Sequence, residues 1–171
     1  MTNSASSTKP TNVKKSQAGE TQSQLPFFVY GTLRTGQGNW ERYLKGNTSQ
    51  EIPATLPKHK MYSRGIAYVT DAEGEEVVVG NLVYVKPEVY QKVLRKIDDL
   101  EGYDPKTDKG HYQRVKRLAE YTDSTTDQLC QVEAWVYHGG PAALSHLGED
   151  ARVMEGDWLR WLRTSPARRI T

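Results

Sequence analysis

The chain lacks the features that mark several large classes of protein. Among its 171 residues only Cys130 is a cysteine, which excludes an internal disulfide framework and fits a reducing compartment. Lys and Arg number 23 against 21 Asp and Glu, and this small excess does not indicate nucleic-acid binding. No apolar run could span a bilayer, and no segment resembles a secretory leader. We therefore expect a cytoplasmic protein with neither a nucleic-acid nor a membrane partner.

Sequence motifs for metal, phosphate and acyl-enzyme chemistry are also missing. The histidines follow no H-E-x-x-H pattern and no paired C-x-x-C is present, so the sequence predicts no metal site; they are His59, His111, His138 and His146. There is no phosphate loop ending in Gly-Lys-Ser/Thr, no G-x-G-x-x-G and no G-x-S-x-G. Cys130 shares the apolar face of an alternating run with Val132 and Ala134, which favours a buried, inert thiol over a nucleophile.

Composition along the chain indicates one domain between two polar ends. Residues 1–25 are mainly Ser, Thr, Asn, Gln and Lys and cannot offset the entropy of ordering, so we predict a disordered tail there. Residues 166–171 are predicted to be a frayed end, which leaves a single domain at 26–165.

Many predicted strands and few helices indicate an α+β fold, and closing the sheet on itself would remove exposed edges. A polar linker through Pro53 and Pro57 is expected to lead into the strands. The sequence predicts a hairpin of 59–69 and 75–85 joined by a turn at 71–74, and a second hairpin of 112–121 and 128–137.

An apolar strand runs directly into a glycine-containing turn near residue 31. Phe27 to Tyr30 are aromatic or β-branched, and Gly31 and Gly36 allow backbone angles that set N–H groups side by side. Such a row of donors binds a carboxylate or phosphate without a cationic side chain, and Arg34 would add a two-pronged contact if it turned inward. The alternative for this segment alone is an ordinary strand end.

A predicted amphipathic helix carries the second candidate. Pro87 suits its first turn, and Gly102 is a typical helix stop. Glu101 lies in the phase of the apolar stripe, so its carboxylate should point towards the core, unlike those of Asp98 and Asp99. Burial, the negative helix end and the two aspartates would each raise the pKa of Glu101 and make it a base near neutral pH. The alternative is a solvent-exposed glutamate at a frayed helix end.

The last predicted helix has an aromatic face made by Trp158, Trp161 and Leu162, while Arg160 and Arg163 face elsewhere. Trp with Arg is also typical of helices that lie on a membrane surface, but this helix is too short for stable binding there. We expect it to dock on the sheet.

Three segments, in this order, resemble the γ-glutamylcyclotransferase-like superfamily. They are Tyr30-Gly31-Thr32-Leu33-Arg34 with Gly36 and Asn39; Ile97-Asp98-Asp99-Leu100-Glu101-Gly102-Tyr103 with Tyr112 and Arg114; and Gly156-Asp157-Trp158, which resembles the ending of the small bacterial and archaeal branch. The likeness covers residues 26 to 163. It implies a small mixed β-barrel with flanking helices.

The resemblance also implies an activity, release of 5-oxoproline from a γ-glutamyl amine or amino acid. Glu101 matches the acid/base position and the Tyr30-Gly31-Thr32-Leu33 turn the substrate loop, while Tyr112 and Arg114 match positions that shape the pocket. For those last two, a packed strand tyrosine and an arginine paired with an acid such as Asp99 are alternatives. One general base suffices for an intramolecular reaction, so no cofactor is expected.

Two other classes of function stay open. One is a non-catalytic barrel that binds a glutamyl-like acidic metabolite, for which Glu101 would be dispensable. The other is a γ-glutamyl transferase to another acceptor.

The segment 63–68 departs from relatives that carry a proline after a glycine there, which leaves open whether Arg64 and Tyr68 alter the pocket. The sequence also leaves open whether the amine is a free amino acid, an isopeptide-linked lysine or a protected metabolite. Oligomeric state is not predicted.

Overall fold

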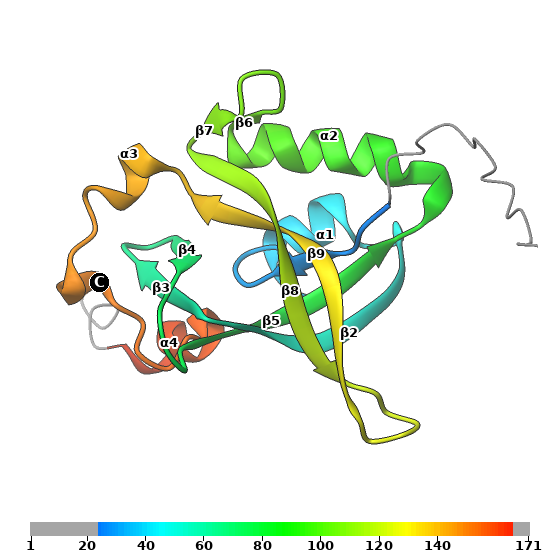
Figure 1. Ribbon diagram of the computed structural model, residues 1–171. Helices are drawn as coiled ribbons and strands as arrows, with labels where there is room; N and C mark the ends of the chain where they lie inside the picture. The colour runs from blue at the N-terminus through cyan, green and yellow to red at the C-terminus, as the bar shows by residue number, and fades with distance from the viewer. Residues whose placement is uncertain (1–23, 166–171) are drawn as a thin grey trace, which may run out of the picture.

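The structure is a computed structural model that describes residues 24–165 and has a closed barrel at its centre (Figure 1). The strand order is β1-β5-β2-β8-β9, and β1 runs parallel to β9 to close the barrel. These strands are β1 (Phe27–Val29), β2 (Thr48–Pro57), β5 (Val77–Val85), β8 (Tyr112–Thr122) and β9 (Leu129–Gly139). The predicted α+β barrel and the second predicted hairpin are thereby confirmed. Most of the predicted tail and all of 166–171 lie outside the described residues.

Short helices flank the barrel. They are α1 (Gly38–Tyr43), η1 (Pro87–Val89), α2 (Tyr90–Glu101), α3 (Pro141–Leu144), η2 (Glu149–Ala151) and α4 (Trp158–Thr164). The longest of them, α2, begins after Pro87 and ends at Gly102, whose φ of 61° lies in the left-handed region that favours glycine, as predicted. In Figure 1, α2 crosses one side of the barrel, with α1 beneath it. No helix in the described range is long and apolar enough to cross a membrane.

Alternation along β1 divides the core in two. Phe28 packs with barrel-interior residues such as Leu56 and Val136, whereas Phe27 belongs to a second cluster that includes the buried face of α2. Because successive side chains of a strand point to opposite faces, this three-residue strand joins both clusters. The chain that follows β1 therefore emerges between the barrel and α2.

The predicted hairpin of 59–69 and 75–85 is wrong. The first run is itself a hairpin, formed by β3 (His59–Ser63) and β4 (Ala67–Asp71), and it turns at Gly65, whose φ is 94°. The second run is β5, which pairs with β1 and β2 inside the barrel. The prediction failed because Gly65, at which the chain turns, lies within a run whose composition is typical of one continuous strand. A further small hairpin, β6 (Tyr103–Asp104) with β7 (Lys109–Gly110), follows α2.

The predicted polar linker through Pro53 and Pro57 is wrong as well, because both prolines lie in β2. This strand pairs with β5 along its length but has a registered pair with β8 only between Thr55 and Glu120. Proline is tolerated in a strand where its missing N–H would face an edge without a partner. The prolines therefore do not exclude β2 from the barrel.

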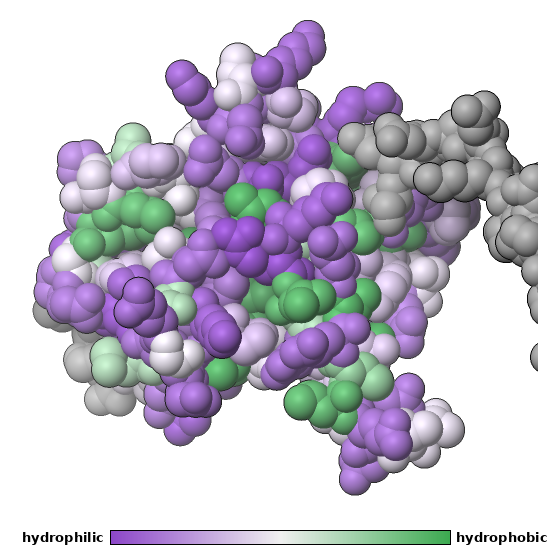
Figure 2. Space-filling model, in the orientation of Figure 1, coloured by the Kyte–Doolittle hydropathy of each residue, from purple (hydrophilic) through white to green (hydrophobic). Residues whose placement is uncertain are grey.

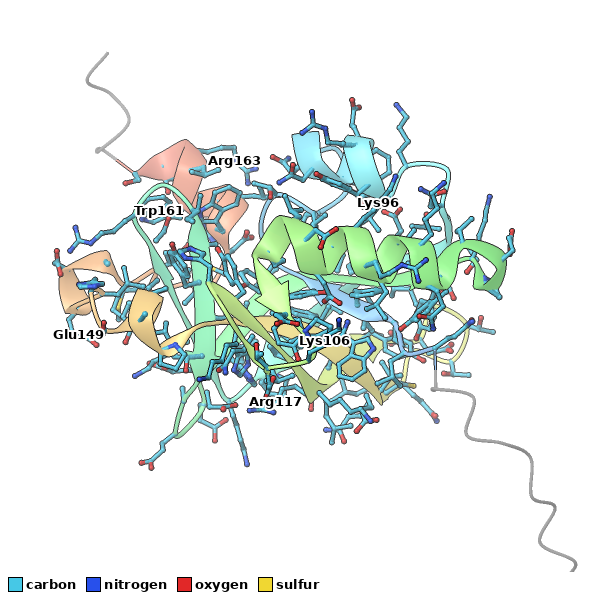
Figure 3. All side chains as sticks on the ribbon, turned by 90° about the horizontal axis from the view of Figure 1, so that it is seen from above. Lys96, Lys106, Arg117, Glu149, Trp161 and Arg163 are labelled. Atoms are coloured by element: carbon cyan, nitrogen blue, oxygen red, sulfur yellow. The ribbon has the colours of Figure 1, made fainter. Side chains whose placement is uncertain are left out.

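The C-terminal helix docks on the barrel, as predicted. Trp158 is buried and donates from Nε1 to the Ser63 hydroxyl at 3.1 Å, while Trp161 and Leu162 pack against the barrel cluster. Figure 3 shows Trp161 and Arg163 on this helix. Just before it, the Gly156 carbonyl accepts from the Val79 N–H at 2.9 Å, which ties this end of the chain to β5.

The surface in Figure 2 is mainly hydrophilic, with hydrophobic side chains in separate groups, as expected when most apolar residues are inside. Cys130 lies on the inward phase of β9, but it is half-buried instead of buried as expected. The reason is its position near the end of β9, beyond the interior that Ala134 and Val136 fill.

Candidate active site

The two segments singled out in the sequence face one cavity of about 230 Å³. Its wall is formed by β1 and the turn after it, the end of α2, the tip of the β3–β4 hairpin, the start of β8 and the end of β9. The lining residues are Phe28, Val29, Tyr30, Gly31, Thr32, Leu33, Asn39, Ile66, Ala67, Leu100, Glu101, Tyr112 and Tyr137. Among these described residues none is Lys or Arg, so the wall offers no cationic side chain.

The turn after β1 is held by its own hydrogen bonds. The Arg34 N–H donates to the Gly31 carbonyl at 3.0 Å, the Trp40 N–H donates to the Thr32 carbonyl at 3.1 Å, and the Asn39 amide donates to the Thr32 hydroxyl at 2.7 Å. Within residues 24–165, none of the main-chain hydrogen bonds outside the helices and strands has the N–H of Gly31, Thr32 or Leu33 as its donor. These N–H groups are available to bind an anion at the cavity.

The glycines of this turn differ from the expectation in one respect. Gly36 has a φ of 83° and requires the left-handed region, but Gly31 does not. A Cβ built on Gly31 would instead lie 3.7 Å from the Cβ of Ala67, at the tip of the β3–β4 hairpin. Gly31 therefore lies beside this tip and is not needed for an unusual backbone angle.

Glu101 is the last residue of α2, and its carboxylate faces the cavity. Burial raises its pKa to about 7. Of the three causes expected from the sequence, burial alone accounts for this shift; neither the helix end nor the two aspartates is needed. Across the described part of the chain the carboxylate forms no hydrogen bond or ion pair, so it stays able to accept a proton from a ligand.

Three tyrosines close the cavity, and each hydroxyl is already used. Tyr30 donates to the Tyr137 carbonyl, Tyr112 donates to the Ala67 carbonyl at 2.8 Å, and Tyr137 donates to the Asp98 carboxylate at 2.7 Å. Burial and then the nearby Glu101 charge raise the pKa of Tyr112. The tyrosines therefore serve as neutral walls, and Tyr112 anchors the hairpin tip.

The two predicted arginines lie outside the cavity. Arg34 does not turn inward, because its guanidinium donates to Asp157 at 2.9 Å and to the side-chain carbonyl of Asn81 at 3.0 Å. Its ion pair ties the turn to the residue that caps α4. Arg114 instead pairs with Asp98, through Nη1 contacts of 2.7 and 2.9 Å to the two carboxylate oxygens.

Asp98 differs from the expectation in two respects. It is buried, and it takes the place expected for Asp99 as the acid that pairs with Arg114. Burial raises its pKa, although the Tyr137 hydroxyl and the Arg114 charge act in the opposite direction. The Arg114 guanidinium in turn lies 4.8 Å from the ring centre of Trp135. These contacts fix the last turns of α2, and with them Glu101, against β8 and β9.

Arg64 and Tyr68, the two residues expected to bear on the choice of amine, also lie outside the cavity. Arg64 pairs with Asp150 at 2.6 Å on the surface, and Tyr68 stacks on Tyr112 with 5.2 Å between ring centres. The hairpin instead contributes Ile66 and Ala67, which the sequence did not indicate because the predicted strand ran through the turn. Tyr137 was missed too, since only its pairing in the barrel brings it beside Glu101.

A small barrel with an unpaired carboxylate opposite main-chain N–H donors is suited to acid–base chemistry on a small anionic molecule. The family described as gamma-glutamyl cyclotransferase, AIG2-like, matches residues 27–160, and the chain belongs to this family. A relative from Methanocaldococcus jannaschii named "Putative gamma-glutamylcyclotransferase MJ1514" is 38% identical over 110 residues, which cover 64% of this chain and 80% of the relative.

Solved structures share the fold. The uncharacterized protein PH0828 from Pyrococcus horikoshii has a TM-score of 0.50 and 20% identity, covering 81% of this chain and 95% of its own. The uropathogenic E. coli-specific protein c4763 has a TM-score of 0.53 and 14% identity, covering 82% of this chain and 96% of its own. At these identities the likeness concerns the fold alone.

Proposed function

We propose that the chain releases 5-oxoproline from a γ-glutamyl amine or amino acid, with Glu101 as the general acid and base. The observation that carries the proposal is an unpaired, largely buried carboxylate whose pKa burial raises to about 7, facing the turn at Gly31, Thr32 and Leu33. Membership of the gamma-glutamyl cyclotransferase family supports the same reaction.

The substrate would be held by its glutamyl end. Because no lysine or arginine is among the described residues that line the cavity, its α-carboxylate would accept hydrogen bonds from main-chain N–H groups of the turn. A volume of about 230 Å³ lies below the range of drug-sized sites and suits one glutamyl group better than a longer peptide. The leaving amine would then extend towards the cavity mouth.

In the proposed reaction Glu101 accepts a proton from the α-ammonium of the substrate. The freed amine attacks the γ-carbonyl carbon and forms the new C–N bond of the lactam ring. The C–N bond to the leaving amine then breaks as that amine receives the proton from Glu101. Glu101 next takes the second proton from the ring nitrogen and passes it to the released amine, which departs as an ammonium. Holding the reacting ends together can supply about 7–11 kcal/mol, and one general base adds about 10²- to 10⁴-fold.

The direct test is to incubate the purified chain with γ-glutamyl amino acids, γ-glutamyl amines and γ-glutamyl-lysine isopeptides. We expect 5-oxoproline and one equivalent of amine from at least one of these classes, measured by mass spectrometry. Saturable binding without any product would contradict the proposal and favour a binding protein. Transfer of the glutamyl group to an added amine, without 5-oxoproline, would favour a transferase.

The pH dependence follows from the protonation state of Glu101. A general base works in its ionised form, so kcat/KM should rise with pH up to the pKa of about 7 and fall about tenfold per unit below it. A pH–rate profile of 5-oxoproline release between about pH 4 and pH 8 measures this limb. A limb centred near the ordinary value of 4.5 would instead mean that Glu101 is not buried in the working enzyme.

A further inference from the structure

Two histidines and an aspartate, far apart in the sequence, meet on the side of β9 away from the cavity. His59 is the first residue of β3 and pairs across the hairpin with Asp71, the last residue of β4. His138 lies on β9 next to Tyr137, which lines the cavity. Because neighbouring side chains of a strand point to opposite faces, His138 points away from the cavity and towards the hairpin.

The three side chains bring potential metal ligands close together. Nε2 of His59 lies 2.9 Å from Nε2 of His138 and 3.2 Å from a carboxylate oxygen of Asp71. One ligand atom from each residue falls within 4.8 Å of the others. Only 3% of His59 and 6% of His138 is exposed, whereas Asp71 is at the solvent edge. The cluster thus has a buried nitrogen pair and one accessible oxygen ligand.

The hydrogen bond made by Nδ1 of His59 determines which tautomer the ring adopts. Nδ1 lies 2.8 Å from the Pro57 carbonyl, which only accepts, so Nδ1 carries the proton. In the neutral ring Nε2 then has a lone pair, and it faces the Asp71 carboxylate, another acceptor. Two acceptors at 3.2 Å repel each other unless a proton or a metal ion lies between them. A backbone carbonyl on the outer nitrogen is also the usual partner of a metal-binding histidine.

We propose that Nε2 of His59, Nε2 of His138 and the Asp71 carboxylate bind a divalent transition-metal ion of the zinc class. Two imidazoles and a carboxylate are a typical zinc ligand set, with a fourth position left for water. Ligands at tetrahedral positions about 2.0–2.1 Å from zinc are about 3.3 Å apart. The His59–Asp71 distance of 3.2 Å fits this geometry, and the nitrogen pair at 2.9 Å needs only a slight opening.

Arg117 of β8 carries a positive charge beside the proposed cation site and already pairs with one of its ligands. Its Nε and Nη2 donate to the two Asp71 oxygens at 2.8 and 2.7 Å (Arg117 is labelled in Figure 3). Each carboxylate oxygen has two acceptor positions, so it can bind a metal while it accepts from the arginine. Arg117 therefore orients the ligand, as hydrogen-bonded carboxylates at metal sites commonly are oriented.

A surface groove beside Asp71 gives a route from solvent. It is lined by Lys60, Asp71, Ala72, Glu73, Glu76, Glu149 and Arg152, in which acidic residues outnumber basic ones. Such a lining favours the approach of a cation to the exposed carboxylate.

A bound ion would join the base of the β3–β4 hairpin to the barrel. The hairpin forms its own two-stranded sheet, and the opposite end of it supplies Ile66 and Ala67 to the cavity wall. The metal would therefore stabilise the wall from outside without contacting the substrate, and this proposal does not depend on the reaction proposed above.

The test titrates the full chain, first freed of metal by a chelator, with Zn²⁺ in a calorimeter. We expect about one Zn²⁺ per chain and a higher midpoint of thermal unfolding. Co²⁺ in the same experiment should give the visible absorption of a low-coordinate site. Mg²⁺ should do neither, because it prefers oxygen ligands in octahedral geometry.

Variants assign the ion to the cluster. His138→Gln and Asp71→Asn should each weaken Zn²⁺ binding at least about tenfold, whereas His146→Gln, which changes an exposed histidine after α3, should not. The Asp71 side chain is 59% exposed, so Asp71→Asn stays informative if His138→Gln does not fold. No Zn²⁺ binding, or binding of unchanged strength in Asp71→Asn, would overturn the proposal.

Discussion

Replacing Glu101 with glutamine will lower kcat/KM for 5-oxoproline release by about 10²- to 10⁴-fold, the contribution of one general base. Glutamine has nearly the same shape but cannot accept the proton of the α-ammonium. The carboxylate forms no hydrogen bond or ion pair within residues 24–165, so the substitution leaves no buried partner unsatisfied there. Product release measured by mass spectrometry at pH 8, where the carboxylate is ionised, gives the ratio of the two enzymes.

The same substitution should make the protein more stable at alkaline pH. The folded-state pKa of Glu101 is about 7, raised from 4.5, so the folded chain holds this proton more tightly than the unfolded chain. The stability from this group is full below pH 4.5 and is lost as pH rises through about 7. Glutamine stays neutral throughout. The midpoint of thermal unfolding of Glu101→Gln, relative to that of the original chain, should therefore be higher at pH 8 than at pH 4.

Glu88→Gln is the matched control, because it makes the same chemical change at an exposed position before α2. Neither its activity nor its unfolding temperature should change measurably. If Glu101→Gln kept full turnover, Glu101 would not be the base. If both variants lost activity equally, the loss would reflect the change in surface charge and not the cavity.

Local patterns were enough to predict the parts of the site whose direction the helix or strand itself determines. The phase of Glu101 on α2 and the strand–glycine turn at Tyr30 each specify a direction without knowledge of the partner. Arg34 and Arg114 could not be placed in this way. A long side chain turns to whichever acid the fold brings near, and Asp157 and Asp98 become neighbours only after the barrel closes.

The same limit applies to the fold and to the proposed metal-binding cluster of His59, Asp71 and His138. The β8–β9 hairpin was predicted because its strands are adjacent in the sequence, whereas β2 was missed since its prolines weaken a strand pattern that pairing with β5 overrides. His59, Asp71 and His138 follow no ligand spacing. Only the register of β3 with β4 and the contact of this hairpin with β9 bring them together.

Asp98→Ala is expected to lower the free energy of unfolding by about 3–5 kcal/mol, because it leaves a buried arginine without its counter-charge. Only 9% of the Arg114 side chain and 7% of the Asp98 side chain are exposed. Nε of Arg114 already lacks a hydrogen-bond partner, and within the described residues the guanidinium has no hydrogen-bond acceptor other than Asp98. For a chain of this length the loss corresponds to roughly 10 °C in the midpoint of thermal unfolding.

The neighbouring residue provides the control for this second prediction. Asp99 is exposed on the same turn of α2, so Asp99→Ala should change the unfolding free energy by less than about 0.5 kcal/mol. Replacing both partners, as in Asp98→Leu with Arg114→Met, should restore most of the stability, since an apolar pair of similar size carries no desolvation cost. Chemical denaturation of the original chain, of Asp98→Leu, of Arg114→Met and of the double variant measures the coupling between the two residues. Equal stability of Asp98→Ala and Asp99→Ala would mean that the buried pair does not hold α2, and with it Glu101, against the barrel.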